Sequence, residues 1–128
     1  MVLDVSSFGT SVATMGALAA EYSSDGGNTF NDSTVASPGI GAGQCIRNLG
    51  PHDTPIGFAM VGQFGLFTMD DGVAISTDGG ATYTPQNISS LLTDARYGAF
   101  PSANTWCVPG RSRHASAHAL PSHARARV

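Results

Sequence analysis

The chain has 128 residues, enough for one ordinary domain, and charged residues make up only 12% of it. Lysine is absent and Glu21 is the only glutamate, so strong helix formers are scarce, and no apolar run is long enough to span a membrane. Residues 1–108 hold nine acidic residues and two arginines, a net charge of −7, which argues against nucleic acid as the main partner.

The order of residues predicts an all-β fold. Short apolar runs are separated by glycine, serine, asparagine and aspartate, a pattern typical of strands joined by tight turns. The apolar content of 41% can supply a core, so disorder is the weaker interpretation. Val12–Ala20 lacks a basic flank, and we interpret it as strand and turn rather than a signal peptide. The predicted strands cover 11–15, 18–22, 56–62, 65–68, 73–76, 81–84, 97–100 and 105–108, with a hairpin turn at Asp71-Gly72.

Two eight-residue segments repeat one another. Ser23–Phe30, the first octet, and Ser76–Tyr83, the second octet, both read Ser-x-Asp-Gly-Gly-x-Thr-aromatic. They begin 53 positions apart, close to the spacing of about 40–50 residues that propeller blades show. A repeat of this length predicts one small antiparallel sheet for each copy.

The residue types of the octet predict a self-contained turn. An aspartate in a turn accepts hydrogen bonds from backbone N–H groups just ahead of it, and glycines supply positive φ angles. The hydroxyl groups bond across the turn, and the trailing aromatic side chains are expected to point inward between sheets. We therefore assign a structural role, and neither catalysis nor calcium binding, to Ser23, Asp25, Gly27, Thr29, Phe30, Ser76, Asp78, Gly80, Thr82 and Tyr83.

The octets resemble the Asp-box, or bacterial neuraminidase repeat, of the sialidase-like β-propellers. The resemblance covers roughly residues 5–106, and the runs GFAMVGQFG and YGAFPSANTW are closest to photosystem II assembly and stability factors. It implies a partial propeller of about one complete four-stranded blade with parts of two neighbours, at about 5–35, 45–88 and 94–108. Residues 109–128 hold four arginines and no acid, and we expect this tail to be disordered or off-frame.

The resemblance implies a non-enzymatic scaffold or protein-interaction module that binds a protein partner or the remaining propeller blades. The alternative is a fragment of a sialidase-like glycosidase or of a lectin-like, carbohydrate-binding propeller. A sialidase needs three arginines, a tyrosine nucleophile with a glutamate, and an aspartic acid. Only Arg47 and Arg96 precede the tail, so the expectation leans away from an enzyme. The candidate locations are the thylakoid lumen of plastids and the secretory route.

Other motifs are weaker. Asn31 and Asn87 fit the acceptor pattern for N-glycosylation. Asp70-Asp71 is read as a solvated hairpin turn rather than a calcium site, and the histidines of the tail as part of a basic segment rather than a metal site. No cofactor or metal is expected. Cys45 and Cys107 are more readily read as two free thiols than as a disulfide.

Overall fold

A computed structural model describes residues 1–112 and 123–127; from residue 112 onward it describes the backbone alone. The described chain is all-β and contains no helix, as predicted. The first sheet has the order β1-β2-β3-β4 and is antiparallel throughout. Its strands are β1 (Asp4–Phe8), β2 (Ser11–Met15), β3 (Ala20–Ser23) and β4 (Asn31–Asp32).

The second sheet is larger and has the order β5-β9-β8-β7-β6. Four of its strands form an antiparallel meander, and the short β5 joins β9 in parallel at the edge. Its strands are β5 (Thr34–Val35), β6 (Ile40–Leu49), β7 (Gly57–Phe64), β8 (Asp70–Ser76) and β9 (Thr82–Asn87). Each octet thus connects the third and fourth strands of a four-stranded meander.

The prediction for residues 65–72 is wrong. Gly65–Thr68 is not a strand but the turn between β7 and β8, where Gly65 and Met69 both have positive φ angles. Asp71 and Gly72, predicted as a turn, lie inside β8 opposite Gln63 and Gly62. The solvated hairpin expected at Asp70-Asp71 is therefore also wrong, and Asp71 is buried. The backbone reverses at the positive-φ residues and not at the Asp-Gly pair.

Sequence analysis did not predict β6, because glycines interrupt its first half. Those glycines are needed for close packing. A Cβ on Gly43 would lie 2.0 Å from the Met15 methyl carbon, and one on Gly41 would lie 2.6 Å from the Met69 sulfur. A glycine in a strand commonly marks such a close approach. At Gly43 the approach is between the first and second sheets.

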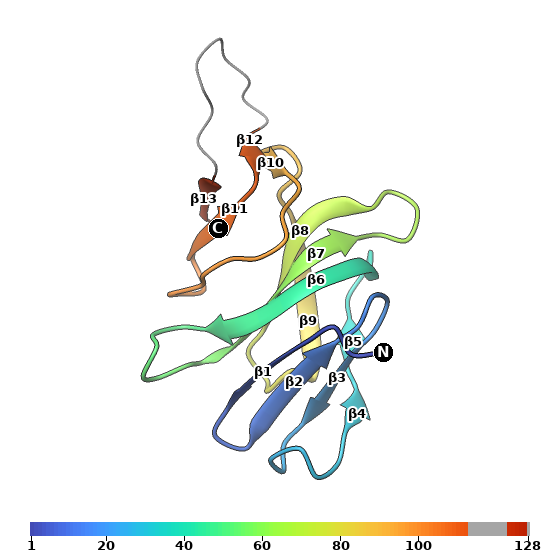
Figure 1. Ribbon diagram of the computed structural model, residues 1–128, viewed down its shortest axis with the longest axis vertical. Helices are drawn as coiled ribbons and strands as arrows, with labels where there is room; N and C mark the ends of the chain where they lie inside the picture. Colours follow the sequence, from blue (N-terminus) through green and yellow to red (C-terminus); the bar gives the residue numbers. More distant parts are fainter. Residues whose placement is uncertain (113–122, 128) are drawn as a thin grey trace.

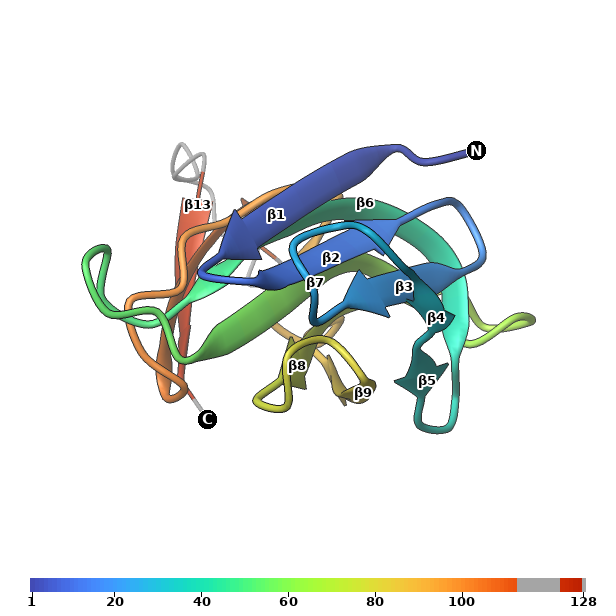
Figure 2. The ribbon, with the colours of Figure 1, turned by 90° about the horizontal axis from the view of Figure 1, so that it is seen from below.

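The sheets are stacked in layers and curl into a half-barrel (Figure 1; Figure 2). One core lies between the two sheets and contains Ala13 and Met15 from the first and Ile46, Phe58, Met60 and Tyr83 from the second. The other core lies between the opposite face of the second sheet and residues 88–108. It contains Val61 and Val73 of the sheet with Leu92, Phe100, Trp106 and Val108. The second sheet is therefore covered on both faces.

The C-terminal part forms two small pairs of strands. β10 (Leu92–Thr93) pairs with β12 (Arg111–Ser112), and β11 (Thr105–Pro109) pairs with β13 (His123–Arg127), both antiparallel. β12 and β13 lie within the segment 109–128, for which the sequence predicts disorder or an off-frame origin, and both pair with strands of the preceding segment. Residues 113–122 and 128, on which the rest of that expectation falls, lie outside the described residues. The described part holds no helix long and apolar enough to cross a bilayer.

Candidate functional site

The first octet closes its turn with hydrogen bonds that span at most four residues. The Ser23 hydroxyl donates to one Asp25 carboxylate oxygen at 2.7 Å and accepts from the Gly27 N–H at 2.9 Å. The Thr29 N–H donates to the same Asp25 oxygen at 2.9 Å, and the Thr29 hydroxyl donates to the other at 2.6 Å. Both oxygens of this carboxylate are therefore occupied within the turn.

The second octet repeats this network. The Ser76 hydroxyl donates to Asp78 at 2.8 Å and accepts from the Gly80 N–H at 2.9 Å. Thr82 donates to Asp78 through its N–H at 2.9 Å and through its hydroxyl. The glycines agree equally well: φ is 74° and 94° at Gly26 and Gly27, and 76° and 95° at their counterparts in the second octet. One residue pattern has therefore produced one geometry twice.

These bonds set the acidity of the two carboxyl groups. Donation from the Thr29 hydroxyl and N–H, followed by that from Ser23, lowers the pKa of Asp25 to about 2. Burial raises the pKa of Asp78, but the bonds from Thr82 and Ser76 outweigh it, so this pKa is also lowered. Both groups stay ionised at neutral pH and accept hydrogen bonds. Neither is placed as a proton donor for catalysis.

The two trailing aromatic residues have different surroundings. Tyr83 is 1% exposed and lies in the core between the sheets. A Cβ on Gly80 would lie 3.3 Å from the Tyr83 hydroxyl oxygen and 3.3 Å from the Ala13 Cβ, so this ring packs under the first sheet. Its hydroxyl has no hydrogen-bond partner in the described chain. Phe30 is 43% exposed, and the expectation that it points inward is wrong.

The strand registers explain this difference. Val12 pairs with Ser23 and Phe58 pairs with Ser76, so Val12 and Phe58 hold equivalent positions in the two sheets. Continuing the registers makes Val5 equivalent to Ile46. Phe58 and Ile46 lie in the core between the sheets, as does Tyr83. The equivalent face of the first sheet is the one turned away from the second sheet.

We call this face of the first sheet the outer face, defined by Leu3, Val5, Val12 and Phe30. The exposed fractions of Leu3 and Val5 are 48% and 55%. A Cβ on Gly27 would lie 3.9 Å from Phe30 and 4.0 Å from Val12, which places these two side chains together. An exposed cluster of large apolar side chains marks an interaction site more often than a solvated surface. The outer face is therefore the main candidate site.

A groove lies where β1 meets β6. The groove holds about 570 Å³ and is lined by Ser6, Arg47, Asn48, His52, Phe100 and Cys107, among others. Arg47 donates to an Asp4 carboxylate oxygen at 2.6 Å and to the Ile46 carbonyl at 2.7 Å. Burial raises the pKa of Asp4, but the bonds from the Ile46 N–H and Arg47 outweigh it and lower this pKa. Sequence analysis did not single out Asp4, because its partners lie more than 40 residues away.

The residues considered for catalysis are not brought together. Glu21 lies on β3 and Arg47 lines the groove, whereas Arg96 lines a separate, small pocket of about 60 Å³. No group of three or more histidine, cysteine or acidic side chains is arranged for a metal ion within the described residues. Cys45, whose pKa is raised by burial, and Cys107 are both free thiols. Of the three histidines of the tail, His114 and His118 lie outside the described residues, and the structure describes only the backbone of His123, in β13.

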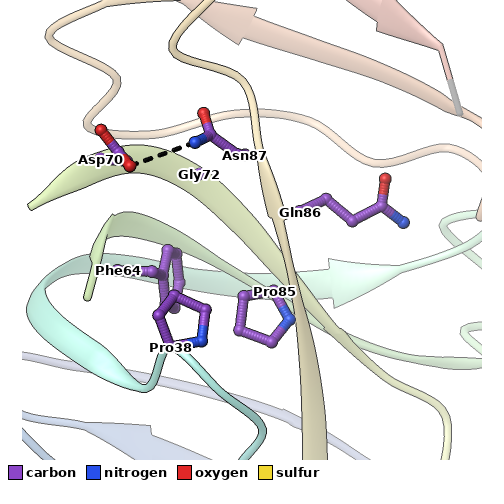
Figure 3. Close-up of a pocket in the computed structure, with 7 residues that line it drawn as sticks. All are labelled: Pro38, Phe64, Asp70, Gly72, Pro85, Gln86 and Asn87. Carbon is purple, nitrogen blue, oxygen red and sulfur yellow. Dashed lines mark hydrogen bonds between the residues drawn. The ribbon is translucent and has the colours of Figure 1, made fainter. Parts of the chain in front are cut away.

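A further pocket of about 200 Å³ lies where β7 ends, β8 begins and β9 ends (Figure 3). It contains Asn87, one of the two glycosylation candidates, at the end of β9. The Asn87 side-chain amide donates to Asp70 at 3.2 Å and accepts from the Ser89 N–H at 2.8 Å. The other candidate, Asn31, is exposed on β4. Neither the pocket nor the Asp70–Asn87 pair was identified from the sequence.

Comparisons of the chain with protein-family models, with curated proteins and with solved structures found no match.

Proposed function

We propose that this chain is part of an Asp-box β-propeller and works as a non-enzymatic scaffold that binds a protein partner or further blades. The main support is the register equivalence of the two sheets. Each contains a four-stranded antiparallel meander with an octet between its third and fourth strands, and the second sheet packs against the first, an arrangement that neighbouring blades of a propeller would give. The assembly-factor resemblance of the octets and their flanking runs points in the same direction.

The outer face is the surface that this proposal assigns to binding. Val5, Val12 and Phe30 hold the positions that the second sheet buries with Ile46, Phe58 and Tyr83, so a sheet like the first one fits over this face. The carboxylates of the octets are occupied within their own turns and are not available for catalysis. Association through the outer face would remove the exposed Phe30 and Val5 side chains from water.

A dye-binding and self-association experiment tests the proposal. The full chain should bind an apolar fluorescent dye and should self-associate in light scattering coupled to size exclusion. Phe30→Ser should reduce both effects. Phe67→Ser is the matched control, because Phe67 is 95% exposed but lies in the β7–β8 turn. A sharply melting monomer that binds no dye would contradict the proposal, as would equal effects of the two substitutions.

The groove beside Arg47 favours a second candidate, a carbohydrate-binding or sialidase-like propeller. An arginine, an asparagine and a histidine on one concave surface can bind the carboxylate and hydroxyl groups of an acidic sugar. Titration with N-acetylneuraminic acid tests it. Binding that is lost in Arg47→Met would favour this candidate over the scaffold.

A further inference from the structure

The pocket of Figure 3 is built from three strands and one turn. Phe64 ends β7, Asp70 and Gly72 open β8, and Asn87 ends β9, while Pro38 belongs to the turn before β6. Its volume of about 200 Å³ is below the range of about 300–1,000 Å³ usual for small-molecule sites. It is large enough for one long side chain.

One end of the pocket is apolar and rigid. Pro38, Pro85 and Phe64 lie together there (Figure 3). Proline rings have little freedom to rearrange, so this end is already formed. Gly72 lets the Phe64 ring pack closely against β8, because a Cβ at this position would come 2.8 Å from that ring. Walls of this kind suit the methylene stem of a long side chain.

The other end carries a positioned negative charge. Asp70 accepts the 3.2 Å bond from the Asn87 amide, and that amide is itself oriented by the bond that it accepts from Ser89. The Gln86 side chain extends away from this pair (Figure 3). Two ion pairs occur in the described part of the chain, Arg47–Asp4 and Arg111–Asp94, and neither includes Asp70.

The net charge of the surrounding protein favours a positively charged ligand. Residues 1–108 carry a net charge of −7, and a field of this sign draws cations towards concave acidic surfaces. Among cationic side chains, arginine has the planar fork that pairs with a carboxylate, and its weakly hydrated head is the easier one to dock beside proline and phenylalanine.

We propose that this pocket binds an arginine side chain of a protein partner, with the guanidinium on Asp70 and the stem between Pro38 and Pro85. The site adds a recognition element for a basic segment and is separate from the outer face. The proposal for this pocket therefore does not depend on the proposed scaffold function.

Ligand-observed saturation-transfer NMR on the full chain tests the proposal and works for a monomer or an oligomer. The probe is N-acetyl-arginine methylamide, and N-acetyl-citrulline methylamide is its neutral counterpart of nearly equal shape. The arginine probe should bind in the millimolar range, and the citrulline probe at least about tenfold more weakly, because a charge-assisted bond is about twice as strong as a neutral one. Equal binding of the two probes, or no binding, would overturn the proposal.

Matched variants locate the binding. Asp70→Asn should weaken binding of the arginine probe about tenfold or more, whereas Asp53→Asn, in the exposed loop after β6, should leave it unchanged. Equal effects of the two substitutions would overturn the assignment to this pocket. So would N-acetylglucosamine saturating the site more tightly than the arginine probe, which would identify a sugar site instead. If Asp70→Asn fails to fold, the comparison of the arginine and citrulline probes on the unmodified chain still tests the proposal.

Discussion

Removing the Tyr83 hydroxyl should stabilise the protein. This oxygen is buried without a hydrogen-bond partner in the described chain, and an unsatisfied buried polar group costs about 1–3 kcal/mol. Tyr83→Phe removes that cost and leaves a void of roughly one oxygen atom, which costs about a few tenths of a kcal/mol. The expected gain is therefore about 0.5–2 kcal/mol, or roughly 2–8 °C in Tm at about 4 °C per kcal/mol.

Urea and thermal unfolding followed by circular dichroism measure this gain. Tyr97→Phe is the control, because Tyr97 is 55% exposed and water can solvate its hydroxyl in the folded and the unfolded chain. This substitution should change the free energy of unfolding by less than about 0.5 kcal/mol. A loss of stability in Tyr83→Phe would refute the reasoning, because it would show that the hydroxyl has a favourable partner.

The pH dependence supplies a second measurement of the same group. Burial, with the nearby negative charge of Asp78, raises the pKa of Tyr83 above its ordinary value of 10.0. Above pH 10 the unfolded chain therefore releases this proton while the folded chain keeps it, so stability falls as pH rises. The slope from one such group is about 1.4 kcal/mol per pH unit. This part of the slope should be absent in Tyr83→Phe, and its persistence there would assign the pH dependence to another group.

Two further predictions concern the octets. The Asp25 carboxyl should titrate at about 2 in carbon-detected NMR, so the stability it contributes is present above pH 4 and is lost as the pH falls through about 2; Thr29→Val should move this pKa up towards 3.8, and an unmodified Asp25 that titrates near 3.8 would contradict the hydrogen-bond network. Gly79→Ala should lower the free energy of unfolding in urea by about 1–2 kcal/mol, because the φ angle of Gly79 is +76°. Steric contacts add little there, since the nearest atom to the new Cβ would be the Ser11 hydroxyl oxygen at 3.5 Å. Gly80→Ala should cost about 1–3 kcal/mol more, since its Cβ would also lie 3.1 Å from the Tyr22 Cβ, and equal costs would argue against tight packing of the sheets there.

Sequence reasoning succeeded where the determinants are local. Residues 11–15 and 56–62 are predicted as strands from apolar and β-branched runs, and the structure places β2 and most of β7 there. Thr105–Val108 was likewise predicted and lies in β11. Sequence reasoning failed where a glycine is required by close packing between segments distant in sequence. Gly41 and Gly43 look like loop residues in the sequence, yet they lie in β6, at positions where neighbouring segments occupy the space that a Cβ would need.

The candidate sites were less predictable than the strands. The Asp4–Arg47 pair joins residues 43 positions apart, and Asp70 meets Asn87 only because β8 and β9 pair in one particular register. Neither spacing carries a signal in a single sequence. The outer face was equally hidden, because Val5 lies in β1, which the sequence did not predict, and Val12 reads as an ordinary core residue of a short strand.

The two octets separate what the sequence determined from what the tertiary structure decided. Serine, aspartate, glycine and threonine at set positions form the same turn twice, since every bond of that turn lies within four residues along the chain. The aromatic residue that ends each octet has no such local partner. Tyr83 is buried because the first sheet lies over it, and Phe30 is exposed because no described segment covers the equivalent face. Burial depends on which surfaces meet across long distances in sequence, and that is set by packing of the whole chain.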